Sequence, residues 1–392
     1  MKKIKIGMFL DSWYPNVDGV VIVVNNLLNN ISEYADVTLV IPKMEKNIDD
    51  SIYPFKVIRI DSLKVPTTDY RLSLSDIKNK EILNRFNNID FDIIHIHSPF
   101  TLGRLGIQIA KTKNIPVIAT MHTRWDFEFK KYLKSNLLVK VIIKHIIKSY
   151  NNCYSCIAMN KQVIKVYQDY GFNGKYEIIN NGTDFEMIKD KNKTINKINN
   201  MYNLKNTDIL FLYVGRIISI KNIFFILDVL KILKERNFKF KMIFVGEGPD
   251  SEKLNIKRRE YNLESDVLLL GKITDRELIK SLYYRADLFL FPSLFDTSSL
   301  VQKEAASQET PSLLIEGSVT ADEVENNING FTVNENKEDY ANRIIEILND
   351  KELYNKVKKN ARNDLAKPWK EISKQTYNYY QKIIKEYNRK KD

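Results

Sequence analysis

The feature that most constrains the fold of this chain is an alternation of short apolar segments with longer amphipathic ones. The apolar segments of the first half are residues 4–10, 36–42, 92–97, 116–122 and 176–180, and those of the second half are residues 209–215, 240–246, 266–271, 287–293 and 311–316. Amphipathic stretches such as residues 221–237 lie between them. Continuous apolar strands separated by helices are typical of parallel sheets covered by helices on both faces. The sequence therefore predicts an α/β fold in which a doubly wound, Rossmann-like sheet occurs twice.

The length of the chain also favours two domains, because 392 residues exceed what one ordinary hydrophobic core accommodates. A polar run rich in Asn and Lys over residues 180–199 begins at an Asn-Gly turn signal and marks the boundary. We predict a first domain over residues 1–184, a second over residues 185–367, and a final helix within residues 368–392 that starts after Pro368.

The formal net charge of +12 indicates an anionic partner, but no nucleic-acid-binding motif accompanies it, so we expect no nucleic acid. The sequence has no run of 18 apolar residues, and no spanning helix is expected. No small-residue cleavage site follows the N-terminal segment, which is interpreted as a first strand instead of a signal peptide. The two cysteines, Cys153 and Cys156, are too few for a zinc site and are predicted to be buried.

Ligands of doubly wound sheets bind at the carboxyl ends of the strands, so the turns there hold the candidate site residues. After one predicted strand, Gly215 opens a turn, Arg216 follows it, and Lys221 starts the next helix. Two cations beside unpaired helix N–H groups would bind a diphosphate. Two solvated surface cations are the alternative.

The next two strands also end in glycine-led turns. Gly246 and Gly248 would let the backbone approach a ligand, and Asp250 can cap the following helix. A plain tight turn explains the same pattern. Gly271 opens a third turn, in which Asp275 is predicted to be an N-cap. Three such turns along one sheet edge favour a ligand site more strongly than any one of them.

Two carboxylates, Asp296 and Glu304, flank the start of another predicted helix. Backbone amides near Ser299, Leu300 and Val301 would lie at the positive end of that helix, which suits a phosphate. Glu304 is placed to accept hydrogen bonds from a ribose diol, and Asp296 to lie beside a transferred sugar. A solvated pair of acids around a helix N-terminus is the alternative.

In their order and spacing, the motifs Arg-x4-Lys, Gly-x-Gly-Pro, Gly-x-Ile and acid-x7-acid resemble family 4 of the retaining, nucleotide-sugar-dependent glycosyltransferases. The resemblance covers nearly the whole chain and implies the GT-B fold, in which two Rossmann-like domains face a central cleft. It implies that the first domain binds the acceptor, that the second binds the nucleotide sugar, and that the last helix crosses back to the first domain. It implies that Arg216 and Lys221 bind the donor diphosphate, that Glu304 binds the ribose, and that Asp296 lies by the sugar and phosphate. The further donor contacts that it implies are Gly215, Gly246, Ile273, Ser299, Leu300 and Val301.

In the first half, the resemblance implies that Gly19 lies in a flexible loop against the donor phosphate and that His122 contacts the donor sugar. His97 follows a strand at the same edge, and His95 is expected in the core. Structural hydrogen bonding is the alternative for His97 and His122. The Asp-Phe-Asp sequence at residues 90–92 matches the metal-binding motif of the other glycosyltransferase fold, but it precedes a strand instead of following one. We expect no metal site there and no cofactor besides the nucleotide-sugar substrate.

The sequence departs from the family at two places. The first acid is Asp296 where the family has Glu, and Thr-Ser-Ser follows it where the family has Phe-Gly or Gln-Gly. In the turn after the helix, Gln308 or Glu309 replaces a glycine. A weakened activity or an altered donor preference is therefore an alternative.

Residues 124–150 hold seven Lys or Arg against two acids. Four aromatic residues lie near the start of this segment: Trp125, Phe127, Phe129 and Tyr132. A basic amphipathic helix suited to an anionic bilayer surface is predicted, and an ordinary covered helix with a solvated basic face is the alternative. Residues 11–20, 97–103 and 121–132 most resemble the family members that put glucose on diacylglycerol.

The resemblance thus implies a cytoplasmic enzyme, peripheral on the inner face of the cell membrane. It would transfer a hexose, glucose from UDP-glucose, to a lipid acceptor such as diacylglycerol or glucosyl-diacylglycerol, with retention of the α configuration. Polyprenyl-linked or surface polysaccharide acceptors are one alternative. A nucleotide-sugar 2-epimerase and an inactive sugar-nucleotide-binding partner subunit are two others.

Overall fold

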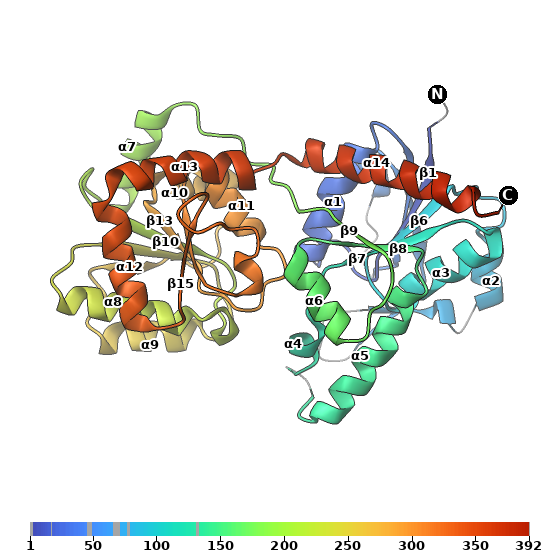
Figure 1. The fold of residues 1–392 in the computed structure, drawn as a ribbon, viewed down its shortest axis with the longest axis horizontal. Helices are drawn as coiled ribbons and strands as arrows, with labels where there is room; N and C mark the ends of the chain where they lie inside the picture. The colour runs from blue at the N-terminus through green and yellow to red at the C-terminus, as the bar shows by residue number, and fades with distance from the viewer. Residues whose placement is uncertain are drawn as a thin grey trace. The chain divides into compact units, whose positions relative to one another are not determined.

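The computed structural model describes residues 3–16, 18–44, 49–65, 71–76, 79–130 and 133–391. The chain forms two compact units. Unit 1 comprises Met1–Asn181 and Trp369–Asp392, and unit 2 comprises Gly182–Pro368. The chain therefore passes between the units twice, near residues 181 and 368, where the sequence placed boundaries at residues 184 and 367. Each unit contains one parallel sheet with helices packed on it (Figure 1).

Unit 1 is built on a seven-stranded parallel sheet in the order β3-β2-β1-β6-β7-β8-β9. Its strands are β1 (Lys5–Phe9), β2 (Asp36–Pro42), β3 (Lys56–Ile60), β6 (Ile93–Ile96), β7 (Val117–Met121), β8 (Ser155–Ala158) and β9 (Tyr176–Ile178). Its helices are α1 (Gly19–Ile31), α2 (Asn79–Asn84), α3 (Thr101–Lys113), α4 (Trp125–Lys130), α5 (Asn136–Asn151), α6 (Lys161–Asp169) and α14 (Trp369–Asn388). The strand order reverses between β1 and β6, and right-handed crossovers then place α1 and α3 on opposite faces.

The final helix, α14, belongs to unit 1 although it follows unit 2 in the sequence. It packs against α1, and two of its tyrosines reach the sheet. The Tyr380 hydroxyl lies 2.7 Å from Nδ1 of His95, and the Tyr379 hydroxyl lies 2.5 Å from Oγ of Ser155. His95 is fully buried, as its place in β6 predicted.

Unit 2 is built on a six-stranded parallel sheet in the order β12-β11-β10-β13-β14-β15. Its strands are β10 (Leu210–Val214), β11 (Lys241–Val245), β12 (Val267–Leu269), β13 (Leu288–Leu290), β14 (Ser312–Ile315) and β15 (Phe331–Val333). Its helices are α7 (Lys191–Tyr202), α8 (Ile223–Glu235), α9 (Ser251–Glu260), α10 (Arg276–Arg285), α11 (Leu300–Ser307), α12 (Lys337–Asn349) and α13 (Lys351–Leu365). Here the strand order reverses between β10 and β13, so ligands are expected at the ends of these two strands.

All ten predicted strands are present, and the α/β fold class is confirmed. The structure adds β3, β8 and β15 to the sheets, and a separate hairpin of β4 (Ser62–Lys64) and β5 (Arg71–Ser73). Cys153 and Cys156 are free thiols, and both are buried as predicted. None of the helices within the described ranges is both long enough and apolar enough to span a bilayer.

The prediction of one amphipathic helix over residues 124–150 is wrong. The segment forms two helices, α4 and α5. Lys131 and Tyr132, which belong to the predicted helix, lie outside the described residues. A new helix begins because the Ser135 side chain caps it, accepting a hydrogen bond from the Leu138 N–H at 3.3 Å. Trp125, expected at a bilayer surface, is instead buried against Phe100 and Phe129.

Candidate active site

The candidate site of unit 2 forms where the turns after β10 and β13 meet. These strands are neighbours in the sheet on either side of the reversal of strand order, so their carboxyl ends open at one place. Lys221 from the first turn forms an ion pair with Asp296 from the second, and its ammonium lies 5.6 Å from the centre of the Phe291 ring. The structure thereby brings together the residue predicted to bind the diphosphate and the acid predicted to lie beside the sugar. Arg216 lies in the same first turn and is exposed.

Gly246 and Gly248 are required by the backbone of the neighbouring turn. A Cβ at Gly246 would lie 1.9 Å from the carbonyl oxygen of Gly215, and one at Gly248 would lie 2.2 Å from that of Ile217. The Ile217 N–H also donates to the Glu247 carbonyl at 3.1 Å. The backbone at these glycines was predicted to approach a ligand. It instead approaches the backbone of the turn that carries Arg216. The glycines fix the shape of that turn.

Asp250 occupies the N-cap position of α9, as predicted, but its side chain accepts no hydrogen bond from a backbone N–H of that helix. Its carboxylate instead accepts from the Ser219 backbone N–H at 2.7 Å, at the start of the short helical turn Ser219–Lys221. This hydrogen bond lowers the pKa of Asp250. Asp250 thus fixes the turn that presents Lys221. Asp275, in contrast, caps α10 as predicted, accepting from the N–H groups of Glu277 and Leu278.

Helix α11 begins at Leu300, with Ser299 as its N-cap. The Ser299 hydroxyl accepts from the Gln302 N–H at 3.3 Å, and Leu300 and Val301 form the first turn. Just before this helix, Oδ2 of Asp296 and Oγ of Ser298 are buried without a hydrogen-bond partner. Unsatisfied buried oxygens are costly and call for a partner. Hydroxyl groups of a sugar at the positive end of α11 would supply one.

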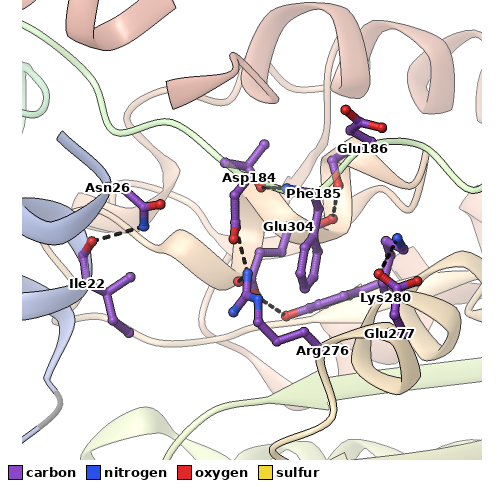
Figure 2. A network of polar contacts seen from close by, with 12 residues as sticks. Ile22, Asn26, Asp184, Phe185, Glu186, Arg276, Glu277, Lys280 and Glu304 are labelled. Carbon is purple, nitrogen blue, oxygen red and sulfur yellow. Dashed lines mark hydrogen bonds and ion pairs between the residues drawn. The ribbon is translucent and has the colours of Figure 1, made fainter. Parts of the chain in front are cut away.

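Glu304 lies in α11 and is held by two residues of α10 (Figure 2). The Tyr283 hydroxyl donates to its Oε2 at 3.2 Å, and Nη2 of Arg276 lies 3.5 Å from its Oε1. Arg276 also donates to Asp184 at 2.6 Å, and its guanidinium stacks 4.4 Å from the centre of the Phe185 ring.

Burial raises the pKa of Glu304 to about 7, because the charged form loses hydration. Arg276 and the hydrogen bond from Tyr283 oppose this change, whereas the like charge of Asp184 adds to it. Glu304 therefore changes charge near neutral pH. Of the other predicted donor contacts, Ile273 lies partly buried in the turn after β12.

The predicted residues Gly19 and His122 belong to unit 1. Gly19 is exposed at the start of α1, and a Cβ there would meet no atom within 4 Å. His122 follows β7, is buried, and its Nε2 lies 3.1 Å from Nδ1 of His97, which follows β6. Burial lowers the pKa of His122 to about 3, so this histidine is neutral at physiological pH. One ring of the pair donates to the other.

The Asp-Phe-Asp sequence has a structural role at the edge of β1. Asp92 accepts from the Lys5 backbone N–H at 2.7 Å, and Asp90 accepts from the Lys5 ammonium at 3.2 Å. Both carboxylates therefore hold Lys5.

The structure also shows which residue takes the place of the family's glycine in the turn after α11. Glu309 has a φ of +59°, so it occupies the left-handed position that suits glycine. Gln308 is buried and forms two hydrogen bonds to the backbone of the segment before α7. Its side chain donates to the Glu186 carbonyl at 3.0 Å and accepts from the Ile188 N–H at 3.1 Å. Gln308 thus fastens the start of unit 2 to the end of α11.

Sequence reasoning missed Arg276, Tyr283 and Asp184 as neighbours of Glu304. Arg276 directly follows the predicted cap Asp275, which was the only local signal that it starts a helix at this sheet edge. Contact between α10 and α11 depends on tertiary packing, which no spacing in the sequence encodes.

Two protein-family models match most of the chain. Residues 17–187 match the model of Glycosyltransferase Family 4, and residues 194–364 match the model of Glycosyl transferases group 1. The two matches fall in units 1 and 2, apart from the first model's last residues.

Several curated relatives cover the chain. The alpha-monoglucosyldiacylglycerol synthase of Acholeplasma laidlawii is 25% identical, over 98% of this chain and 99% of the relative. The synthase of that name from Streptococcus pneumoniae is 25% identical over 78% and 70%. The UDP-Gal:alpha-D-GlcNAc-diphosphoundecaprenol alpha-1,3-galactosyltransferase of Escherichia coli is 28% identical over 81% and 80%.

Solved structures share the fold. Anabaena Alr3699/HepE in complex with UDP has a TM-score of 0.75 at 15% identity, covering 97% of this chain and 100% of that one. WaaG, a glycosyltransferase involved in lipopolysaccharide biosynthesis, has a TM-score of 0.70 at 14% identity, covering 96% and 99%.

Proposed function

The chain belongs to the glycosyltransferases, with a family 4 domain followed by a group 1 domain in a GT-B fold, and on that premise we propose that it transfers glucose from UDP-glucose to a membrane lipid. The acceptor that we propose is the hydroxyl of diacylglycerol or of glucosyl-diacylglycerol. The names of the Acholeplasma and Streptococcus relatives support this choice.

The pairing of Lys221 with Asp296 at the switch point is the observation that carries the donor half of the proposal. An ammonium has three donors, so a carboxylate and a phosphate can share it. We propose that Lys221, Arg216 and the N-terminus of α11 stabilise the negative charge of the departing diphosphate. Glu304 would bind the ribose diol, and Asp296 and Ser298 would contact the sugar.

The reaction that we propose retains the α configuration. The acceptor oxygen would form a bond to the anomeric carbon as the bond to the diphosphate breaks, on the same face of the sugar. The acceptor proton would pass to a departing phosphate oxygen. Because this route needs no protein nucleophile, positioning and charge stabilisation supply the catalysis.

The exposed face of α5 supports the lipid acceptor. Leu137, Leu138 and Val141 lie there with 74%, 46% and 59% of their surfaces exposed. Exposed lysines adjoin them along and before the helix: Lys134, Lys140, Lys144 and Lys148. Apolar side chains among lysines suit the surface of an anionic bilayer. We propose that this apolar and basic face, residues 134–148, holds the enzyme on the inner face of the cell membrane.

A polyprenyl-linked acceptor is the second candidate. The observation that favours it is the Escherichia coli relative, whose name gives a diphosphoundecaprenol acceptor. Such an acceptor also lies at a membrane, so the basic face of α5 is compatible with both candidates.

The proposed function is tested by the release of UDP from UDP-glucose or UDP-galactose and of GDP from GDP-mannose, each with diacylglycerol, glucosyl-diacylglycerol or a polyprenyl-linked sugar in vesicles. We expect release from UDP-glucose that requires one of the diacylglycerol acceptors. Release that requires the polyprenyl-linked sugar would favour the second candidate. Release of UDP from UDP-sugar without any acceptor would contradict a transfer reaction.

Metal independence is a further expectation of this proposal. Two cations and a helix N-terminus would neutralise the leaving group, so EDTA should leave the rate of sugar transfer within about twofold of the untreated enzyme. The measurement is the initial rate with EDTA and with added manganese. Complete loss of the rate, restored by manganese, would contradict the proposal.

A further inference from the structure

Arg276 lies between two carboxylates, and the three side chains form one network within unit 2 (Figure 2). Its Nη2 atom is 2.6 Å from Oδ1 of Asp184 and 3.5 Å from Oε1 of Glu304. The guanidinium plane rests on the ring of Phe185, which fixes the place of the positive charge. Asp184 and Phe185 belong to the segment that enters unit 2, where Gln308 fastens the backbone to α11.

We infer that Arg276 is a positioning residue for donor binding: shared between Asp184 and Glu304, it holds the Glu304 carboxylate in the ionised and oriented form that a ribose diol can use. The inference rests on the proposed function, in which Glu304 binds the ribose. It adds a residue that acts through Glu304 instead of touching the sugar nucleotide. Asp184 competes for the same guanidinium and limits its effect.

The chemistry of the diol explains why the charge state matters. Two neighbouring hydroxyls donate two hydrogen bonds, and an ionised carboxylate offers two accepting oxygens. A protonated carboxyl presents an O–H at one of these positions and loses one acceptor. The pKa of Glu304 is about 7, raised by burial and lowered in part by Arg276. The affinity for the nucleotide sugar should therefore fall as the pH drops below 7.

Among the described residues, three titratable groups have the largest effect on the charge of Glu304. They are Arg276 and Tyr283 from α10 and Asp184 from the segment before α7. The Tyr283 hydroxyl keeps its proton because burial raises its pKa far above the usual range. The charge balance at Glu304 is therefore set by Arg276 against Asp184.

The pair of Arg276 with Asp184 is too exposed to serve mainly as a source of stability. Their side chains are 50% and 45% exposed, and surface ion pairs contribute little to folding. The effect of Arg276 on Glu304 is larger than its effect on folding, because a nearby cation favours the ionised form of a buried carboxylate that water solvates poorly. High salt should weaken that effect.

The test measures the affinity for UDP-glucose between pH 5.5 and 8.5, without an acceptor, by calorimetry. The diphosphate of UDP-glucose is a diester and does not titrate in this range. Removing the cation with Arg276→Met should move the midpoint of the profile up by about one pH unit and weaken binding about fivefold at pH 7. Removing the competitor with Asp184→Asn should move the midpoint down by about one unit and strengthen binding about fivefold at pH 6.

Opposite shifts from the two variants are the result that a structural role would not produce. Arg362→Met is the matched control, because Arg362 is 46% exposed and pairs with Glu309 at 3.7 Å. It should leave the midpoint in place. An analogue of UDP-glucose without the 2′ and 3′ hydroxyls should bind all variants with no midpoint near pH 7.

Two outcomes would overturn the inference. An unchanged midpoint in both variants would show that Arg276 does not set the charge of Glu304, and an equal loss of affinity at every pH in Arg276→Met would show direct contact with the ligand. The variant Glu304→Gln distinguishes a failure of the inference about Arg276 from a failure of the proposed function. If Glu304→Gln binds UDP-glucose as wild type does at pH 8.5, the ribose role itself is wrong; if it binds weakly and without a midpoint, that role stands.

Discussion

Replacing Lys221 by alanine is expected to lower kcat by about 10² or more, because it removes a charged donor from the leaving diphosphate. Arg216→Ala should act in the same direction and to a similar degree. The measurement is UDP release with saturating UDP-glucose and acceptor vesicles. Lys221 also pairs with Asp296, so its loss should release that carboxylate as well. The affinity for free uridine, which lacks phosphates, should not change in either variant.

Lys231→Ala is a suitable control, since Lys231 is an exposed lysine of α8 that pairs with Glu235 at 3.7 Å. Its kcat should equal that of wild type. Turnover within a few-fold of wild type for both Lys221→Ala and Arg216→Ala would remove the diphosphate site from this account.

Reversing the charge of the basic face of α5 is expected to weaken binding to anionic vesicles strongly. Each lysine near an anionic surface contributes about 1 kcal/mol, so Lys134→Glu, Lys140→Glu and Lys144→Glu together should weaken binding by more than about a hundredfold. Leu137→Ser and Leu138→Ser should remove the part of the binding that salt does not weaken. The measurement is sedimentation with vesicles of increasing anionic lipid content at low and high salt.

The control for this experiment reverses three exposed lysines of α13, Lys351, Lys356 and Lys359, in unit 2. This control should bind vesicles as wild type does unless net charge alone drives the binding. Both triple variants should keep wild-type affinity for UDP-glucose. If the wild-type protein ignores anionic vesicles, the lipid acceptor loses its structural support and a soluble acceptor becomes the better proposal.

The sheets were predictable because buried parallel strands are apolar along their whole length. The segment that became β10 carries this signal without interruption, whereas β3 contains Lys56 and Arg59 and was missed. Arg59 is tolerated there because it pairs with Asp50 at 2.7 Å. The break between α4 and α5 was missed because apolar residues recur on both sides of Ser135, whose capping depends on the local backbone.

The location of a candidate residue was predictable where the turn that carries it follows a clear strand, as with Arg216 and Lys221 after β10. Its contacts were less predictable where the partner lies in another turn. The Asp250 side chain accepts from the Ser219 N–H instead of from a backbone N–H of α9. Gly246 is glycine because the Gly215 carbonyl leaves no room for a side chain. Such contacts arise from packing between segments, which spacing along one chain does not record.

We propose above all that this chain moves glucose from UDP-glucose to a lipid hydroxyl with retention. The most direct test supplies UDP-glucose labelled with ¹³C at the anomeric carbon, together with diacylglycerol in anionic vesicles, and analyses the extracted lipid by NMR. We expect a labelled glycolipid with an α-linked glucose, formed by wild type and greatly reduced in Lys221→Ala. A β-linked product, or label found only in free glucose or in a water-soluble product, would contradict it.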